Sequence, residues 1–527
     1  MIQMISIIGL LISLMANADP VDLTVVTKIR DEGFNRSQVM QTLSHLSDNI
    51  GPRLTGSPGL LQANNWTKEQ MAQWGLENAR LEGFEFGRGW TMERVEVFMT
   101  SPRRTQLYAL PIAWLPGTDG ELEGGAIYAP IKEKTDFQKY KGKLKGKIIF
   151  IDKVPDEKEP LTRIFRRHDR ESLEEIGLFD IPTEDMSKKN EEQWFNWISF
   201  LPELDKFLVA EGAKAIVRRP RHDGMKVTAS NYQYLISDKA NLPGISLAAE
   251  HYDRAVRLMK KDREVALSLD VEVTFHEKNT QSYSTLADIP GKGSRPEVVM
   301  AGAHLDSWFA GDGAVDNAAG VAVVMEAVRI LKAIGIKPKR TIRVGLWGGE
   351  EQGRYGSLQY VINHLAERPL SKNENLKYMA ASGGQLFGGF PIDTKSEFER
   401  FSVYFNIDGG SGKMRGISAE ENSAAAEIFR HWLEPFHDLE ADTVVQNRYL
   451  GTDHESFDRV GLPGFNFIQD PLDYRSRLHH TQLDLLNHVY EKDLKQASVI
   501  LASFLYNAAM REERIPRKPL PQGPDQY

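Results

Sequence analysis

The sequence predicts an α/β protein, with a mixed central sheet flanked by helices and a second, mainly-β domain inserted into it. Two observations support this prediction. From about residue 282 onward, short apolar runs alternate with a segment whose apolar residues recur at helical spacing. Between about residues 120 and 270, short β-like runs are instead separated by glycines and lysines. The composition, 41% hydrophobic and 26% charged, is ordinary for a folded protein.

The α/β part can be followed element by element. Residues 297–304 (EVVMAGAH) and 340–347 (RTIRVGLW) have the length and β-prone composition of buried strands. Residues 316–335 between them carry the helical pattern and end in glycine, which is typical of a helix end. Residues 401–408 and 461–468 are predicted as further strands. This order favours one sheet with helices on both faces.

The change of pattern along the chain divides it into domains. Residues 35–110 are predicted to be mainly helical. Residues 155–205 are charged and helical in pattern, which indicates a helical insertion within the β-like region. We therefore expect a main domain from residues 19–115 and 275–515, an inserted domain at 116–274 and a polar tail at 516–527.

The first 20 residues have the pattern of a secretory signal peptide. An apolar run is followed by Ala16-Asn17-Ala18, a small-x-small cleavage pattern. We expect cleavage after Ala18, which makes residues 1–18 the leader and sends the protein to the periplasm or outside the cell. No later run reaches the ~20 apolar residues that a membrane span needs.

Charge and cysteine content exclude several functions. The net charge is −8 and no strongly basic domain is present, which argues against a nucleic-acid partner. The chain has no cysteine. Disulfide scaffolds, thiol catalysis and thiolate metal sites are therefore excluded, and any metal must be held by histidine, aspartate or glutamate.

Acidic and histidine side chains collect where the predicted strands end. HLDSW follows the first strand, GGEEQG follows the second and DGG ends the third. Asp316-Asn317 and HHTQLD (479–484) add further candidates. One acid at a strand end is usually a helix cap or turn residue, but ligands of open α/β sheets bind beyond the carboxyl ends of strands. The recurrence of such residues predicts a site of oxygen and imidazole groups.

The chain resembles the co-catalytic zinc exopeptidases, a family that includes bacterial leucyl-type aminopeptidases, carboxypeptidase Q and folate-hydrolase-type glutamate carboxypeptidases. The resemblance covers nearly the whole mature chain and depends on six motifs in this order: HLDSW, GAVDNAAG, LWGGEEQG, NIDGG, TDHESF and HHTQLD. The inserted region resembles a protease-associated domain. The resemblance implies an exopeptidase of short peptides, acting as an aminopeptidase or a dipeptidase.

Other functions fit parts of this pattern. Trimming of C-terminal residues, as in glutamate carboxypeptidases, is an alternative within the family. A non-catalytic receptor on the same fold is an alternative of another class, and a single-zinc acyltransferase of related fold is a third. Relatives of the last two kinds do not keep the full ligand set, which is complete here.

The resemblance also assigns roles to individual residues. Two zinc ions, with manganese or cobalt as substitutes, would share five ligands: His304 and Asp408 on one metal, Glu351 and His480 on the other, and Asp316 on both. Glu350 would be the general base. Oxygen and imidazole donors suit zinc, and a shared carboxylate offsets the repulsion between two cations. With three ligand carboxylates, a bridging hydroxide would bring the site to neutrality.

Neighbouring residues are expected to orient the ligands. Asp306 lies two residues after His304, so its carboxylate is expected to accept the second imidazole N–H. Asp484 is given the same role for His480, or a role in shaping its loop. Asp316-Asn317 is expected to open the following helix, where the helix dipole favours a carboxylate.

Three further residues near the late motifs are candidates for holding the oxyanion of the reaction: His454, Tyr474 and His479. Arg448, Arg475 and Arg477 are candidates for binding a substrate carboxylate. The inserted domain is predicted to restrict access to short peptides or to contribute to a homodimer.

Overall fold

The computed structural model describes residues 21–522, apart from 157–162, 180–195, 197–198, 233–238, 295 and 370–388. The predicted signal peptide therefore lies outside the described residues, as does much of the helical insertion predicted for 155–205. Within the described part, no helix combines the length and apolar character that a bilayer span requires.

The main body is built on a mixed sheet, which confirms the predicted fold class. Its described strands lie in this order: β1 (Glu77–Glu85), β10 (Gln281–Ile289), β12 (Thr341–Trp347), β11 (Val298–His304), β15 (Phe401–Asn406), β18 (Gly464–Gln469), β16 (Met414–Ser418) and β17 (Thr443–Val445). Strands β12, β11, β15 and β18 run parallel to one another, and β10 and β16 run antiparallel to their neighbours in this central group.

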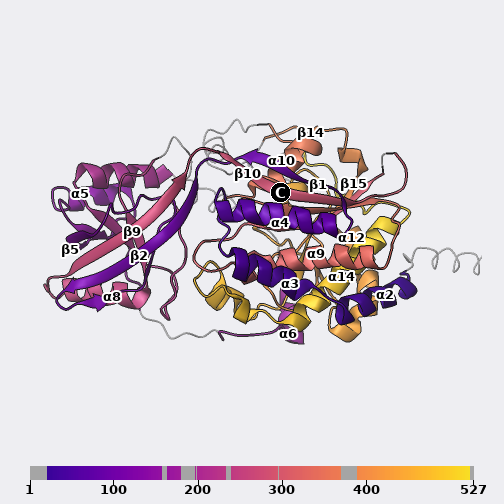
Figure 1. Cartoon of the computed structure of the whole chain (residues 1–527), viewed down its shortest axis with the longest axis horizontal. Helices are drawn as coiled ribbons and strands as arrows, with labels where there is room; N and C mark the ends of the chain where they lie inside the picture. Colours follow the sequence, from indigo (N-terminus) through magenta and orange to yellow (C-terminus); the bar gives the residue numbers. More distant parts are fainter. Residues whose placement is uncertain are drawn as a thin grey trace, which may run out of the picture.

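Helices cover both faces of this sheet (Figure 1). One face packs against α4 (Pro58–Gln73), α9 (Ala319–Ala333), α12 (Ser423–Leu433) and α14 (Glu491–Met510), and α2 (Leu23–Asn35) and α3 (Val39–Ser44) pack on α9 and α14. The other face packs against α10 (Tyr355–His364) and α13 (His454–Asp458). Strand β11 contributes to the cores on both faces of the sheet. Val299 and Ala301 belong to one core and Met300 to the other, and every residue of β11 is buried.

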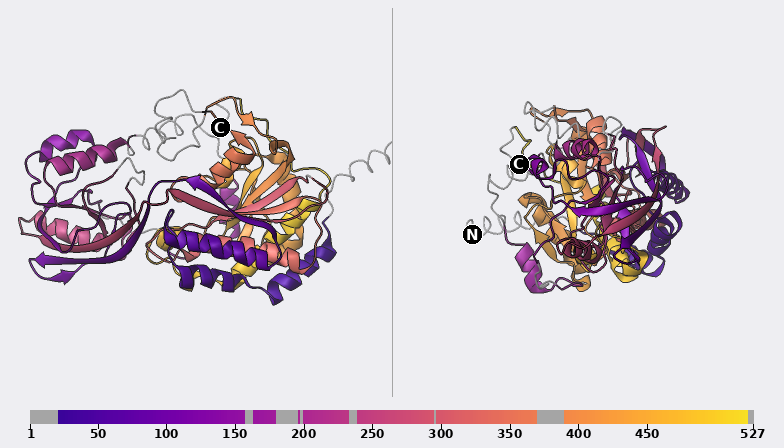
Figure 2. Two further views of the ribbon diagram at one scale, coloured as in Figure 1. Left: turned by 45° about the horizontal axis from the view of Figure 1, so that its top comes forward. Right: turned by 90° about the vertical axis from the view of Figure 1, so that its left-hand side faces the viewer.

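A second sheet forms a separate lobe (Figure 2). Its described strands lie in this order: β3 (Thr105–Gln106), β2 (Gly89–Ser101), β9 (Ala266–His276), β5 (Leu122–Tyr128), β6 (Ile148–Phe150), β7 (Ala215–Arg218), β8 (Gly244–Leu247) and β4 (Ala109–Pro111). Helices α5 (Phe137–Tyr140) and α8 (Ala249–Met259) accompany it. The long strands β2 and β9 lead from the main body into this lobe, as Figure 1 shows.

The prediction that residues 35–110 are mainly helical is wrong from residue 77 onward. This part of the chain supplies β1 to the main sheet and β2, β3 and β4 to the second sheet. In β2, Val95, Val97 and Met99 belong to or pack against the core of the second lobe, and they alternate along the strand with other residues. An apolar residue at every second position is the pattern of a strand.

The parallel strands bring the predicted motifs to one edge of the main sheet. His304, the last residue of β11, lies directly beside Trp347, the last residue of β12. Asn406, the last residue of β15, pairs with Gly302 of β11. The segments that follow these strands therefore leave the sheet at the same level, and they contain Glu350, Glu351 and Asp408.

Candidate metal centre

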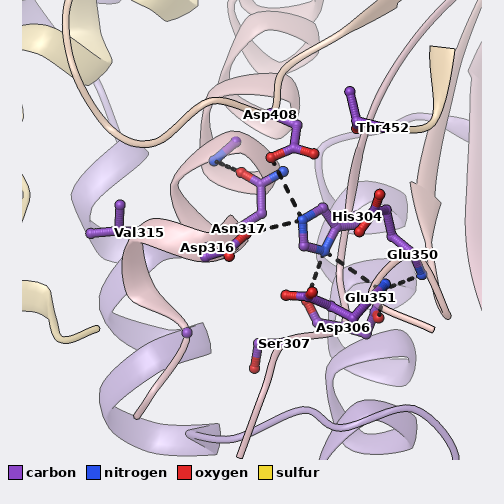
Figure 3. Close-up of polar contacts among 12 residues, drawn as sticks. His304, Asp306, Ser307, Val315, Asp316, Asn317, Glu350, Glu351, Asp408 and Thr452 are labelled. Carbon is purple, nitrogen blue, oxygen red and sulfur yellow. Dashed lines mark hydrogen bonds and ion pairs between the residues drawn. The ribbon is translucent and has the colours of Figure 1, made fainter. Parts of the chain in front are cut away.

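The first cluster of donors surrounds His304. Its Nε2 atom lies 3.3 Å from Oδ1 of Asp316 and 3.8 Å from Oδ1 of Asp408 (Figure 3). The His304 side chain is 1% exposed, and those of Asp316 and Asp408 are 5% and 13% exposed. Three candidate ligands from β11, from the segment before α9 and from the end of β15 thus meet in a nearly closed site.

The second cluster lies on the other side of Asp316. Nε2 of His480 is 3.3 Å from Oδ2 of Asp316 and 3.0 Å from Oε2 of Glu351. The indole N–H of Trp308 donates to the same oxygen of Glu351 at 2.8 Å. The two carboxylate oxygens of Asp316 therefore face two different clusters, each with one imidazole and one further carboxylate.

The spacing and chemistry of these donors fit two metal ions. Two ligands bound tetrahedrally at ~2.1 Å from one zinc lie ~3.4 Å apart, and the distances within the clusters range from 3.0 to 3.8 Å. Oδ2 of Asp316 and Oε1 of Glu351 are buried without a well-oriented hydrogen-bond partner among the described residues. Buried polar atoms of this kind need a ligand, and a cation would supply it.

Burial and charged neighbours shift the pKa values of the residues in the two clusters. Burial opposes protonation of His480, but Glu351 and Asp316 outweigh it and raise its pKa to about 10. Burial is likewise outweighed at Asp316, whose pKa the imidazoles of His304 and His480 hold well below its usual range. Burial raises the pKa of Glu350 well above its usual range, and nearby carboxylates add to the effect.

The two glutamates of the GGEE motif are fixed by a third acid. The carboxylate of Asp306 accepts the backbone N–H groups of Glu350 and Glu351, each at 3.2 Å, and the hydroxyl of Thr55 at 3.1 Å. Gly349 before them has φ +75°, a backbone conformation that favours glycine. The turn is therefore held by its backbone, which leaves both glutamate side chains free to face the donors.

Asp306 does not orient His304 through its carboxylate, which corrects the prediction. Nδ1 of His304 donates to the backbone carbonyl of Asp306 at 3.0 Å, whereas the carboxylate oxygen lies 3.6 Å away. The chain turns immediately after β11, which places the backbone carbonyl of Asp306 beside the imidazole of His304. The carboxylate of Asp306 is instead bonded to the backbone N–H groups of the GGEE turn. The tautomer is still fixed, and Nε2 is left to the donor cluster.

Asp484 supports Asp316 instead of His480, which is the second correction. Its carboxylate accepts the backbone N–H groups of Val315 at 2.6 Å and Asp316 at 3.1 Å. The prediction gave Asp484 either the imidazole of His480 or the loop of His480, and its carboxylate instead holds the loop before α9. Burial and the charge of Asp316 raise the pKa of Asp484 to about 8.

Asp316 and Asn317 precede α9 and do not form its first turn. Both have non-helical backbone angles, the peptide bond between them is cis, and α9 begins at Ala319. The side chain of Asn317 accepts the N–H of Gly320 at 3.1 Å and donates to the carbonyl of Ile407 at 2.8 Å. Asn317 therefore ties the start of α9 to the residue before Asp408.

The three oxyanion candidates lie in different surroundings. His479 stacks on His480 with ring centres 3.6 Å apart, and its Nε2 is 4.0 Å from Asp316 Oδ2. Burial, with the charge of His480, lowers the pKa of His479 to about 3. Tyr474 is buried and meets His479 edge-on, with ring centres 5.1 Å apart. His454 is fully buried, with Nε2 3.4 Å from a carboxylate oxygen of Glu420.

The structure adds residues that the motifs did not single out. Arg53 is fully buried and donates to the backbone carbonyls of five residues around the site: Leu46, Gly51, Leu305, Asp312 and Gly313. Trp308 and Thr55 contact the carboxylates described above. Trp308 stands within HLDSW, whereas Arg53 and Thr55 lie outside the six motifs.

A mixed α/β sheet with one imidazole–carboxylate cluster at the ends of its parallel strands, and a second completed by a turn and a loop, fits a metal-dependent hydrolase. Comparison with known proteins agrees with this class: residues 284–505 match the model of Peptidase family M28. The chain thus carries an M28 peptidase domain and is a peptide hydrolase. This confirms the class of enzyme predicted from the six motifs.

Individual relatives extend the match over nearly the whole chain. Carboxypeptidase Q of Mus musculus is 24% identical over 499 residues, which cover 94% of this chain and 90% of the mouse protein. The structure of a Peptidase M28 precursor from Shewanella amazonensis aligns with 94% of this chain and 98% of its own, with TM-score 0.66 and 22% identity. BSAP, a zinc aminopeptidase from Bacillus subtilis, aligns over 90% and 95% with TM-score 0.56 and 20% identity.

Proposed function

We propose that the protein is a two-zinc exopeptidase that hydrolyses short peptides. The observation that carries the proposal is the position of Asp316, whose two oxygens face separate clusters, one with His304 and one with His480. Similarity to a zinc aminopeptidase and to carboxypeptidase Q supports both the metal and the exopeptidase class.

In this proposal His304 and Asp408 would hold one zinc, Glu351 and His480 would hold the other, and Asp316 would contribute to both. Bound zinc supplies a Lewis acid that polarises the substrate carbonyl and lowers the pKa of water to ~7. Burial of His304 and Asp316 keeps bulk water away from that chemistry, because both side chains are at most 5% exposed.

Glu350 moves the proton of the reaction. Its backbone is held by Asp306, its side chain is not assigned as a ligand, and burial raises its pKa well above the usual range, a direction typical of carboxyl groups that transfer protons. It takes a proton from the attacking water and returns it to the leaving amine nitrogen. Asp306 acts as a positioning residue for this step, since it fixes the peptide groups of both glutamates.

Arg475 favours recognition of a free substrate carboxylate, and hence dipeptidase activity within the exopeptidase class. Of the three candidate arginines, Arg448 pairs with Asp458 at 3.1 Å and Arg477 with Asp473 at 3.6 Å. Arg475 has no ion pair with a described carboxylate and lies 3.0 Å from Nε2 of His479, beside the second cluster. A guanidinium there can form a charge-assisted hydrogen bond to the end of a short peptide.

The remaining expectations belong to the same proposal. Export through residues 1–18 is supported by the apolar run and the Ala16-Asn17-Ala18 pattern. We assign the second lobe to a protease-associated domain that limits access to short peptides or contributes to a homodimer. Because β2, β3 and β4 belong to this lobe, it begins before the predicted boundary at residue 116. Sequencing the N-terminus of the exported protein and measuring its mass in solution test these points.

One panel of substrates tests the function. It contains free dipeptides, aminoacyl anilides and N-blocked peptides ending in glutamate, each with and without a chelator and added zinc. We expect cleavage of the first two, loss with the chelator and recovery with zinc, at two zinc ions per chain. Cleavage of the blocked peptides alone would favour the glutamate-carboxypeptidase alternative. One metal would favour the acyltransferase alternative, and no metal the receptor alternative.

A further inference from the structure

The segment at residues 470–484 joins β18 to the part of the chain that leads into α14, and it contains Tyr474, His479 and His480. It does not belong to the sheet, yet it supplies the His480 imidazole to the second cluster. We infer that residues inserted between β6 and β8 position this ligand loop, and that Gln482 and Lys226 are the side chains through which they do so. This inference rests on the proposed two-zinc function.

The first set of contacts comes from residues 225–230. The N–H of Ala229 donates to the carbonyl of His480 itself at 2.8 Å. Thr228 and Thr481 form an antiparallel β-bridge. The backbone around the ligand is therefore paired with a strand-like segment that lies more than 200 residues earlier in the sequence.

Two side chains close this junction. The amide of Gln482 accepts the N–H of Val227 at 2.9 Å and donates to the carbonyl of Met225 at 3.0 Å, so it completes the pairing begun by the backbone. The ammonium group of Lys226 donates to the carbonyl of Ser476 at 2.9 Å, near the middle of the ligand loop.

The second set of contacts holds the other end of the loop. The N–H of Arg166 donates to the carbonyl of Leu472 at 3.0 Å. The guanidinium of Arg167 donates to Asp470 at 2.9 Å and pairs with Asp493 at 2.8 Å. The Asp470 side chain is fully buried, so this charge needs the arginine. Helix α6 (Arg170–Ile176), which follows, lies against the main body in Figure 1.

His480 needs this support because of its backbone. Its φ is +60°, a left-handed conformation that is unfavourable for residues with a Cβ atom. Such a conformation persists only where the surroundings hold it, and the bond from Ala229 is made to this residue. The two imidazoles differ in this respect, because His304 ends a buried strand paired on both sides.

The geometry therefore predicts that weakening the junction affects one metal and spares the other. Without Gln482 or Lys226 the ligand loop would sample other conformations, and His480 would leave Glu351 and Asp316. His304 and Asp408 would stay in place, because the sheet holds them. Partners that orient a metal ligand typically contribute 10–100-fold in metal affinity.

The test compares Gln482→Leu, which removes both amide bonds, with Gln106→Leu, an exposed glutamine of β3 in the second lobe. Zinc content of the full chain is measured against graded chelator, and the absorption spectrum of the cobalt-substituted protein follows each site. We expect Gln482→Leu to hold one ion as tightly as wild type and the second ~10–100-fold more weakly. The control should match wild type.

A second pair of variants keeps the test decisive if Gln482→Leu does not fold. Lys226→Met removes the bond to Ser476, Lys226→Arg keeps a donor, and Lys214→Met is the control, since the ammonium of Lys214 donates to the carbonyl of Glu123 within the second lobe. We expect a weakened second ion in Lys226→Met and recovery in Lys226→Arg.

Two results would overturn the inference: equal affinity of both ions in the variants and the wild type, or equal weakening of both ions. Failure of the proposed function looks different. Wild-type protein that binds fewer than two zinc ions, or cleaves no peptide, refutes the two-zinc exopeptidase before any variant is compared.

Discussion

The two halves of the candidate metal centre are built in different ways. The half around His304 and Asp408 comes from the ends of β11 and β15, neighbouring strands of one buried sheet. The half around Glu351 and His480 comes from a turn and a loop, and the His480 side chain is 24% exposed against 1% for His304. One half inherits its geometry from the fold, whereas the other depends on contacts added around it.

This difference shows how a site at the edge of a sheet can include ligands from segments outside the sheet. Parallel strands bring together the residues at their ends, but His480 must be brought in from a distant loop. Asp306 holds the turn through its carboxylate, which accepts two backbone N–H groups. Residues 225–230 hold the loop through a backbone hydrogen bond to His480 and through the side chains of Lys226 and Gln482. Asp316 then joins the two halves.

Changing the residue shared by both halves should have the largest effect. Asp316→Asn removes one charge and one oxygen donor from between the clusters, so both ions should bind more weakly. We expect turnover of dipeptides to fall by more than ~10³-fold, because metal stabilisation of the transition state is worth several kcal/mol. Metal content and kcat are measured together, and Asp312→Asn, four residues earlier, is the control.

If Asp316→Asn lost the ion of one half only, the carboxylate would not be shared. The two clusters would then be separate sites, and the comparison between them would have to be redrawn.

Glu350 belongs to neither half, and its substitution should separate chemistry from metal binding. Glu350→Gln keeps the shape and the backbone bond to Asp306 but cannot carry a proton, so kcat should fall ~10²–10⁴-fold while two metals remain. Glu351→Gln should instead lose the ion of the loop half. Glu427→Gln, on the exposed side of α12 (Ser423–Leu433), is the control. Retained turnover in Glu350→Gln would refute its role as the base.

Much of the strand half could be predicted from the sequence, because its signal is local. Continuous apolar runs that end in HLD and NID give both the strands and the residues after them. The confirmed fold class depended on the same runs. The roles of the ligands stay predictions, although the structure brings all five side chains together.

The partners of the acids were harder to predict, because spacing does not fix which group an acid meets. Asp306 and Asp484 were expected to meet imidazoles, and they bind backbone N–H groups of segments about 44 and 169 positions away in the sequence. The pairing of Ala229 with His480 has no local signal at all. Residues 89–101 were misread because a strand exposed on one face carries charges that also suit a helix.

Arg475 tests whether the loop half also recognises the substrate. Arg475→Gln removes the cation beside His479, so free dipeptides should lose ~10–100-fold in kcat/KM, the effect of one charge-assisted hydrogen bond. The ratio of kcat/KM for a dipeptide to that for its amide should fall toward unity. Arg477→Gln, whose arginine pairs with Asp473, is the control. An unchanged ratio in Arg475→Gln would favour the hypothesis that the enzyme is an aminopeptidase.

The pH dependence of metal binding should give the smallest effect per step, about tenfold for each pH unit, and it distinguishes the halves by the order in which their ions are released. In the metal-free protein the pKa of His480 is raised to about 10, so at neutral pH its imidazole carries a proton that a metal must displace. Affinity of the loop half should therefore fall about tenfold for each unit of pH lowered between 8 and 6, with about one proton released per ion bound.

Zinc titrations of the metal-free protein at several pH values, with an indicator for released protons, measure both quantities. The ion of the loop half should leave first as the pH falls, because its imidazole is the more exposed and stands on a loop. The same pH dependence in His480→Ala would show that the displaced proton belongs to another group. Earlier loss of the ion at His304 would show that burial in the sheet does not strengthen metal binding in that half.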